Sequence, residues 1–318
     1  MKILVTGSAG FIGGYLVDEL LKQGCTVVGI DNFSKYGKKQ KKYANANYEL
    51  VKGDVKNTRL LKKLLAGCDH LIAGAAMIGG IGYFHKYAYD LLAENERIIA
   101  STFDAAIDAF KNDRLKKITV ISSSMVYEST LVFPTPESSL GKTPAPLSTY
   151  GFQKLAAEYF CRGAWEQYRL PYTIVRPFNC VGVGEGKMGH VVPDMVSKIL
   201  AGQDPVHILG KGNQIRCYTY GGDIARGIVA AVFSPKAANG DFNISTAEVT
   251  TVLQLVKLIW KKINGNKPFH FVSDKPFIHD VQKRIPDVRK AKKILGFEAE
   301  MKLNEMLDEV IDWMKKNQ

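Results

Sequence analysis

A tyrosine and a lysine four residues apart, Tyr150 and Lys154, stand at the start of a helix-like segment. This spacing is about one helical turn, so both side chains would lie on one face. An ammonium beside a phenol favours the phenolate and lowers the phenol pKa from its usual value of about 10. The pair therefore predicts a tyrosine base that is usable near neutral pH. The structural alternative is an ordinary helix with one aromatic residue and one lysine.

Three consecutive serines, Ser122, Ser123 and Ser124, precede this pair and follow an apolar, strand-like run at 117–121. A serine hydroxyl at the end of such a strand could bind a substrate oxygen and relay its proton. Serines also end strands for local hydrogen-bonding reasons. Their place ahead of the tyrosine and lysine favours a functional role.

The elements that would position these side chains begin at the N-terminus, where an apolar stretch at 2–5 leads into the sequence TGSAGFIG at 6–13. In this turn Gly7 permits the tight bend, Gly10 a close approach to phosphates, and Gly13 close packing of helix on strand. The following helix-like segment ends near residue 23. Its N-terminus would direct N–H groups and a positive dipole end at a pyrophosphate, which predicts a dinucleotide site.

An acid, Asp31, ends the second strand-like run at 25–30. In this position a carboxylate accepts hydrogen bonds from the adenosine ribose and repels a 2′-phosphate, so NAD is favoured over NADP. The structural alternative is a plain βαβ turn. The lysines that follow could pair with a 2′-phosphate, although such a run is more often a solvated loop; they are Lys35, Lys38, Lys39, Lys41 and Lys42.

Strand-like and helix-like patterns alternate through the first half, which predicts an α/β protein with a Rossmann-type doubly wound parallel sheet. Further strands are expected at 48–52, 69–73, 117–122 and 172–176, and helices at 58–65, 90–110 and 150–168. Later helices are expected near 192–201, 223–233, 251–263 and 303–316. We expect a dinucleotide-binding domain over 1–178 with a returning segment about 214–245. A smaller mixed α/β C-terminal substrate lobe would comprise 179–213 and 246–318.

The bulk composition excludes several classes of protein. The chain has 318 residues, 46% hydrophobic content and a formal charge of +12. No apolar run approaches a membrane span, and the chain passes from Met1 directly into a strand, so we expect a cytoplasmic protein without a membrane partner. Five scattered cysteines without a C-x-x-C pair argue against a metal site. The lysines are not interleaved with aromatic residues, so an acidic small substrate is favoured over nucleic acid.

Taken together, the motifs resemble the extended short-chain dehydrogenase/reductase family, specifically its NAD-dependent nucleotide-sugar epimerases and dehydratases. The resemblance covers essentially the whole length. The matching stretches are TGSAGFIG at 6–13, ID at 30–31, GDV at 53–55, SSSMVY at 122–127, YGFQKLAAE at 150–158, RPFNCVG at 176–182, RCYTYGGDIARGI at 216–228 and RIPDVRKAKKILGF at 284–297.

The resemblance implies NAD as the cofactor and a nucleoside-diphosphate sugar as the substrate of the C-terminal lobe. Asp54 and Val55 resemble an adenine-binding pair, and Ala75 and Ala76 the small residues near the nicotinamide ribose. The expected cofactor-binding residues are Gly7, Gly10, Phe11, Ile12, Gly13, Asp31, Asn32, Asp54, Val55, Ala75, Ala76, Tyr150, Lys154 and Pro177.

The implied catalytic residues are Ser123, Tyr150 and Lys154. Tyr150 would remove the proton of a sugar hydroxyl while C4 gives its hydride to NAD, and Lys154 would hold the nicotinamide ribose and tune Tyr150. Substrate contacts are expected from Ser124, Met125, Asn179, Arg216 and Arg284. The two arginines resemble diphosphate clamps, a task that suits the guanidinium fork.

The type of reaction is less sharply indicated. The 4,6-dehydratases of this family place Asp and Glu where this chain has Ser124 and Met125, so C4 epimerisation is the leading expectation. The glycine-rich segment at 77–83 resembles a loop of GDP-mannose 3,5-epimerases, which carry a cysteine at the position of Met125. Lys187 or His190 could still act on a sugar carbon. A decarboxylase and a ketosugar reductase remain further alternatives.

A binding protein without catalysis, for a nucleotide or RNA, is the alternative from another class. The charge favours it, and the intact serine, tyrosine and lysine set opposes it. The resemblance also implies a homodimer formed through the helices at 90–110 and 150–168. The apolar residues Ile98, Ile99, Phe103 and Phe160 could serve that interface or the protein's own core.

Overall fold

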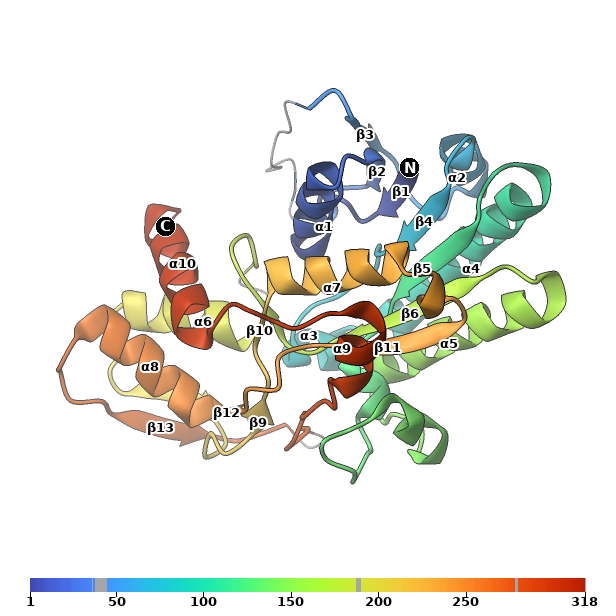
Figure 1. The fold of residues 1–318 in the computed structure, drawn as a ribbon. Helices are drawn as coiled ribbons and strands as arrows, with labels where there is room; N and C mark the ends of the chain where they lie inside the picture. The colour runs from blue at the N-terminus through green and yellow to red at the C-terminus, as the bar shows by residue number, and fades with distance from the viewer. Residues whose placement is uncertain (36, 38–44, 187–189, 278–279, 318) are drawn as a thin grey trace.

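The computed structural model describes residues 1–35, 37, 45–186, 190–277 and 280–317. Its largest element is a seven-stranded sheet in which all neighbouring strands are parallel (Figure 1). The strands are β1 (Lys2–Thr6), β2 (Thr26–Asp31), β3 (Tyr48–Lys52), β4 (His70–Ala73), β5 (Lys117–Ile121), β6 (Tyr172–Pro177) and β11 (Gly240–Ile244).

The strand order is β11-β6-β5-β4-β1-β2-β3, which confirms the doubly wound sheet. The order reverses between β1 and β4. Parallel sheets bind ligands outside the carboxyl ends of the strands at such a reversal, because the connections diverge there to opposite faces.

Helices cover both faces of the sheet. One face carries α2 (Thr58–Leu65), α4 (Ala88–Asn112) and α5 (Thr149–Tyr168), and the other α1 (Phe11–Lys22), α7 (Gly221–Phe233) and α9 (Arg289–Leu295). Side chains alternate along β1, so Leu4 packs in the first core while Ile3 and Val5 pack in the second.

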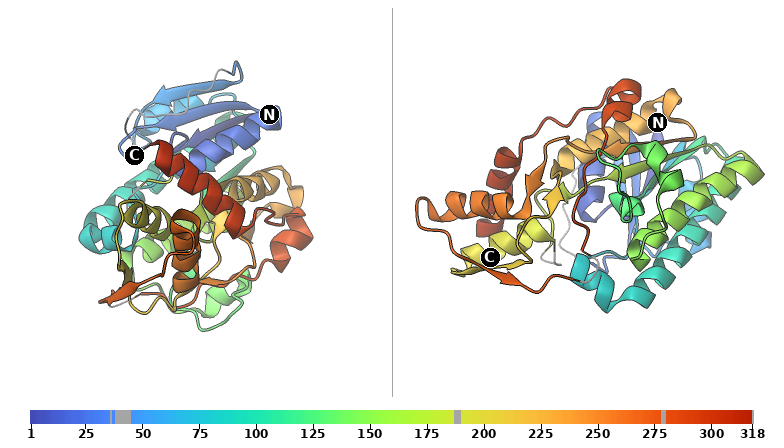
Figure 2. Two further views of the ribbon diagram at one scale, coloured as in Figure 1. Left: turned by 90° about the vertical axis from the view of Figure 1, so that its left-hand side faces the viewer. Right: turned by 90° about the horizontal axis from the view of Figure 1, so that it is seen from below.

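A smaller lobe lies beside the sheet domain (Figure 2). Three helices, α6 (Val191–Leu200), α8 (Val252–Asn264) and α10 (Leu303–Lys316), surround a separate apolar core with the parallel strands β8 (Val206–Leu209) and β13 (Phe271–Asp274). Two short pairs complete the mixed arrangement: β7 (Cys180–Val181) with β10 (Thr219–Tyr220), and β9 (Ile215–Arg216) with β12 (Thr250–Thr251). Within the described ranges, no helix is long and apolar enough to cross a membrane.

The structure corrects one expectation and decides an open one. The segment expected as a glycine-rich loop turns into a short helix, α3 (Ile81–Lys86), with Gly80 as its N-cap. The four apolar residues considered for a dimer interface pack in or against the sheet domain's own core. They are Ile98, Ile99, Phe103 and Phe160.

A buried ion pair joins the sheet to α5. The Arg176 guanidinium donates to both carboxylate oxygens of Glu158, at 2.8 and 2.7 Å, and neither side chain is exposed. Ser122 donates its hydroxyl to the same carboxylate at 2.7 Å. The Tyr127 hydroxyl accepts a further hydrogen bond from Arg176. The Asp241 carboxylate lies 2.9 Å from the Arg176 guanidinium. The network therefore links β5, α5, β6 and β11 behind the carboxyl edge of the sheet.

The β1–α1 turn depends on the absence of side chains. Gly7 has a φ of 72°, which L residues rarely adopt. A Cβ on Gly13 would lie 2.1 Å from the Gly7 carbonyl oxygen, well inside van der Waals contact. The first turn of α1 can therefore fold back onto the end of β1 only when residue 13 is glycine.

Replacing Glu158 by alanine will strongly destabilise the protein, because Arg176 would keep a buried charge without its carboxylate. We expect the free energy of unfolding to fall by about 3–5 kcal/mol, measured by urea denaturation. Glu166→Ala is the matched control, since Glu166 is an exposed acid on the same helix. An equal, small effect of both substitutions would contradict the structural role of the pair.

Gly13→Ala will also destabilise the protein, by about 1–3 kcal/mol, because overpacking against the Gly7 carbonyl outweighs the helix preference of alanine. Gly163→Ala on α5 is the control, because a Cβ there meets nothing within 4 Å. We expect that variant to be as stable as the wild type or slightly more so. If thermal and urea denaturation showed the same increase in stability for both variants, the close approach of α1 to β1 at Gly13 would be contradicted.

Candidate active site

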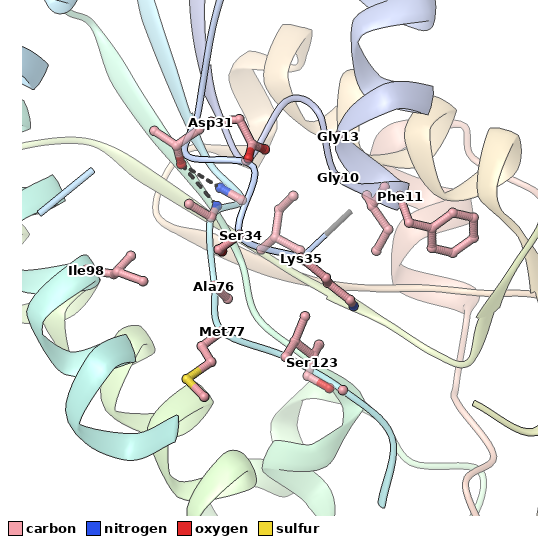
Figure 3. Close-up of a pocket in the computed structure, with 18 of the residues that line it drawn as sticks. Gly10, Phe11, Gly13, Asp31, Ser34, Lys35, Ala76, Met77, Ile98 and Ser123 are labelled. Atoms are coloured by element: carbon pink, nitrogen blue, oxygen red, sulfur yellow. Dashed lines mark hydrogen bonds between the residues drawn. The ribbon is translucent and has the colours of Figure 1, made fainter. Parts of the chain in front are cut away.

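A cavity of about 600 Å³ opens at the carboxyl edge of the sheet. Its lining comes from the ends of β1, β2, β4 and β5, from α5, and from the segments that lead into the smaller lobe. Figure 3 shows Gly10, Phe11 and Asp31 above this hollow and Ser123 below it, with Lys35 extending between them. The size suits a ligand that is enclosed over most of its surface.

Every residue expected to hold NAD lines this cavity: Gly7, Gly10, Phe11, Ile12, Gly13, Asp31, Asn32, Asp54, Val55, Ala75, Ala76, Tyr150, Lys154 and Pro177. Each Asp31 carboxylate oxygen accepts one hydrogen bond from a backbone N–H. Ala9 donates to Oδ2 at 3.1 Å, and Phe33 donates to Oδ1 at 2.8 Å. Each carboxylate oxygen keeps a second lone pair for a ribose hydroxyl. The carboxylate is thereby fixed at the end of β2.

The glycine turn fits the pyrophosphate of a dinucleotide. Gly10 is the N-cap of α1 and offers no side-chain cap to the first helical N–H groups. Such a helix start attracts phosphate oxygens through its N–H groups and dipole. A Cβ on Gly7 would collide with the Ala75 backbone and one on Gly13 with the Gly7 carbonyl, so the two glycine residues allow β1, α1 and the end of β4 to approach closely around the turn.

Ser123, Tyr150 and Lys154 meet at the other end of the cavity. Ser123 follows β5, and its hydroxyl is hydrogen-bonded to the Tyr150 phenol. Ser148 caps α5 by accepting the Gly151 N–H at 3.0 Å, so Tyr150 lies in the first turn of the helix, one residue after its start at Thr149. The spacing of strand end and helix start therefore brings the serine and tyrosine hydroxyls together.

The expected electrostatics of Tyr150 need correction. Burial raises the pKa of Tyr150, whereas the Ser123 hydrogen bond and the Arg284 charge lower it. The Lys154 ammonium instead donates to the Ile121 carbonyl at 2.9 Å. Burial lowers the pKa of Lys154 to about 8, opposed by Glu158. Residue spacing indicated the neighbouring charge but gave no measure of desolvation, which is the larger effect here.

The expected substrate residues divide into two groups. Ser124, Met125, Asn179 and Arg284 line the cavity. The Arg284 Nε is buried and has no hydrogen-bond partner among the described residues. Burial and the nearby Arg216 charge lower the pKa of Arg284 to about 9. An anion in the cavity would satisfy this guanidinium, which fits a diphosphate group.

Arg216 lies off the cavity lining. Its guanidinium donates to the Ile215 carbonyl at 2.9 Å and lies 3.4 Å from Asp280. A motif arginine reads the same in sequence whether it faces a ligand or an internal carboxylate. Direct contact of Arg216 with substrate phosphate therefore stays a prediction, and would require the side chain to leave these partners.

Several lining residues were not anticipated from the sequence. Ile78, Tyr83 and Phe84 form an apolar group with Met125 beside Tyr150. The glycines at 79, 80 and 82 were the sequence signal for this group. Ile98, which was considered for a dimer interface or the protein's own core, also lines the cavity.

A second pair of polar side chains lines the cavity from the smaller lobe. Glu185 and His190 are 2.8 Å apart, between Oε1 and Nδ1. The remaining atoms, Glu185 Oε2 and His190 Nε2, are buried without a hydrogen-bond partner in the part of the chain that is described. Lys187, considered with His190 from the sequence, lies outside the described residues. The described residues contain no group of three metal-ligating side chains.

Comparison with known proteins gives concordant results. The family model of the NAD dependent epimerase/dehydratase family matches residues 3–245. A Bacillus subtilis (strain 168) protein named as an uncharacterized UDP-glucose epimerase, YtcB, is 32% identical, covering 99% of this chain and 98% of its own. A UDP-N-acetyl-alpha-D-glucosaminuronate decarboxylase of Bacillus cytotoxicus is 28% identical, covering 99% and 98%.

Among solved structures, a UDP-glucuronic acid 4-epimerase from Bacillus cereus, in complex with UDP-glucuronic acid and NAD, superposes with a TM-score of 0.89. It is 30% identical, and the match covers all of both chains. This chain therefore matches the solved epimerase in fold and length. It carries the glycine cradle, the acid at the end of β2 and the Ser123–Tyr150–Lys154 group described above. The protein belongs to the NAD-dependent epimerase/dehydratase family.

Proposed function

We propose that this protein is an NAD-dependent C4 epimerase of a UDP-sugar. The convergence of Ser123, Tyr150 and Lys154 on a cavity with a dinucleotide cradle carries the proposal. It is supported by the 4-epimerase whose structure matches over the full length. Bound NAD supplies an acceptor and donor of hydride at the sugar carbon.

The protein's own residues supply proton transfer and orientation. Tyr150 removes the proton of the C4 hydroxyl. It returns a proton to the same oxygen after the 4-keto sugar has rotated to present its other face. Ser123 holds the same oxygen through its hydroxyl. Arg284 and Asn179 bind the diphosphate, which keeps the nucleotide anchored while the sugar presents its other face. The Lys154 ammonium holds the cofactor ribose and adds positive charge near the phenol.

Loss of water from C5 and C6 is disfavoured by the residues beside Tyr150. That reaction needs an acid and a base close to the sugar C6. The 4,6-dehydratases of the family place Asp and Glu at the positions of Ser124 and Met125, and a thioether neither gives nor takes a proton at neutral pH. C4 epimerisation needs no group beyond the three catalytic residues and the cofactor.

The Glu185–His190 pair favours one second candidate, epimerisation at a carbon next to the 4-keto group. A histidine oriented by a carboxylate can remove a proton from such a carbon, because the keto group acidifies it. The two reactions differ in D₂O. Hydride return to C4 brings in no deuterium, whereas proton removal at C3 or C5 exchanges the sugar proton with solvent.

The first experiment is incubation with UDP-glucose, UDP-glucuronate, UDP-N-acetylglucosamine and GDP-mannose in D₂O, without added cofactor, followed by ¹H NMR. Inversion at C4 without deuterium uptake or net NADH supports the proposal. Deuterium at C3 or C5 supports the second candidate instead. Carbon dioxide release, as the named activity of the decarboxylase relative suggests, or a 4-keto-6-deoxy product would overturn C4 epimerisation as the function.

We further infer a cytoplasmic homodimer that pairs through the outer faces of α4 and α5. Three aromatic residues are exposed there, Tyr89, Phe152 and Tyr159, whereas the inward residues of both helices are used in the core. Exposed aromatic side chains on adjacent helices are typical of a buried protein interface.

Tyr150→Phe will lower kcat by about 10²–10⁴-fold, because the variant lacks the hydroxyl that transfers the proton. NAD affinity, measured by isothermal titration calorimetry, should stay within a few fold of wild type. Tyr168→Phe on the same helix is the control and should keep full turnover. Substantial turnover by Tyr150→Phe would exclude the assigned base.

Tyr159→Glu will dissociate the dimer, since a carboxylate would be buried without a partner at the interface. Light scattering after size-exclusion chromatography should show the mass change from twice the chain mass to the 35.2 kDa of one chain. Glu166→Gln is a surface control on α5 outside the aromatic group. A wild-type protein that elutes as a monomer would refute this assembly.

A further inference from the structure

The aromatic ring of Phe84 stacks in parallel on the ring of Tyr150. Phe84, on α3, lies with its ring centroid 4.4 Å from that of Tyr150 and at an interplanar angle of 11°. Both rings line the cavity. Leu91 and Met125 are buried in the same group, and Tyr150 itself is only 5% exposed. The stack is therefore part of the wall beside the proposed base.

Together, two contacts restrain the phenol. Ser123 fixes the hydroxyl by a hydrogen bond, and Phe84 fixes the plane of the ring. A hydrogen bond to oxygen alone leaves the ring free to rotate about its own axis. Proton transfer requires the phenol oxygen within hydrogen-bond reach of the substrate hydroxyl, so a loose ring would spend less time in a productive geometry.

The segment that carries Phe84 is built for this position. The Asn95 side chain makes two hydrogen bonds to the Met77 backbone. Its Oδ1 accepts from the Met77 N–H at 2.8 Å, and its Nδ2 donates to the Met77 carbonyl at 2.9 Å. A Cβ on Gly79 would lie 2.5 Å from the Tyr83 ring, so only glycine admits that ring. The Phe84 N–H then bonds the Gly80 carbonyl at 3.2 Å. The glycine run thus permits a tight turn that delivers Phe84 to Tyr150.

We infer that Phe84 is a positioning residue for Tyr150, holding the phenol ring in its reactive orientation and keeping water from its face. This role rests on the proposed function of Tyr150 as the base. It gives the glycine-rich segment a purpose in the reaction, through a residue that stacks on the proposed base.

The pH dependence follows from the same wall. Burial raises the pKa of Tyr150. Titratable and charged groups near it are Arg284, Lys154 on α5, Tyr83 on α3, and Glu128, whose carboxylate accepts bonds from Ser148 at the start of α5. The base works when deprotonated, so activity rises as the pH passes its pKa. Opening the wall at Phe84 admits water, lowers that pKa, and moves the acid limb of kcat to lower pH.

Three variants test the role by steady-state kinetics. Phe84→Leu should lower kcat by about 10–100-fold, with the KM for the sugar nucleotide changed by no more than about 2-fold. Phe84→Tyr keeps a flat ring and should restore most of the lost kcat. Phe271→Leu removes a ring from a stacked pair in the smaller lobe and serves as the control. An unchanged kcat and pH profile in Phe84→Leu would overturn the inference.

A second measurement needs no substrate. The protein is labelled with 3-fluorotyrosine, and the ¹⁹F signal of Tyr150 is assigned from its loss in Tyr150→Phe. The stack should hinder ring rotation and keep two edge environments of the fluorine resolved, and Phe84→Leu should merge them. Identical spectra would refute positioning by Phe84. Merged signals in a protein that turns over no sugar nucleotide would support positioning and count against the proposed function alone.

Discussion

The ion pair between Arg176 and Glu158 is the constraint on which the site's geometry depends. Burying two charges costs several kcal/mol each unless hydrogen bonds replace the lost water. Here the carboxylate accepts three bonds, two from Arg176 and one from Ser122, so its position is fixed in all directions. The residue after Ser122 is the serine that bonds the Tyr150 phenol. The same carboxylate therefore holds the middle of α5 against the end of β5 and against β6.

The two ends of the cavity are constructed differently. At the cofactor end the site is formed by backbone groups, because Gly7 and Gly13 let the first turn of α1 lie close against the ends of β1 and β4. At the reactive end, side chains that are far apart in the sequence lie together: Ser123 after β5, Phe84 on α3 and Tyr150 on α5.

This difference explains what could be predicted from the sequence. The glycine turn and Asp31 have fixed local spacings, so the strand, turn and acid were predicted directly. The strand at Tyr48–Lys52 and the helix at Thr58–Leu65 also have the expected bounds. Tyr150 and Lys154 were recognised from their spacing. The direction of the Tyr150 pKa was not, because it depends on burial by residues distant in sequence.

Other differences have the same origin. Glycines at 79, 80 and 82 indicated a loop, yet tertiary packing of Tyr83 and Phe84 stabilises a short helix there. Arg216 and Arg284 both stand in family-like motifs, and only the fold shows that one faces Asp280 and the other the cavity. Local patterns identify elements and chemistry, while the partner of each side chain is a property of the folded chain.

The edge strand β11 has a consequence for synthesis of the protein. It pairs in parallel with β6, and its Asn243 donates to the Thr135 carbonyl and accepts from the Tyr127 hydroxyl. Between β6 and β11 the ribosome must first make α6, β8 and α7, together with the short strands β7, β9 and β10. At about 5–20 residues per second, the nascent sheet waits several seconds with its β6 edge unpaired. During that interval the growing chain presents an unpaired parallel edge, which is when a chaperone would have most to protect.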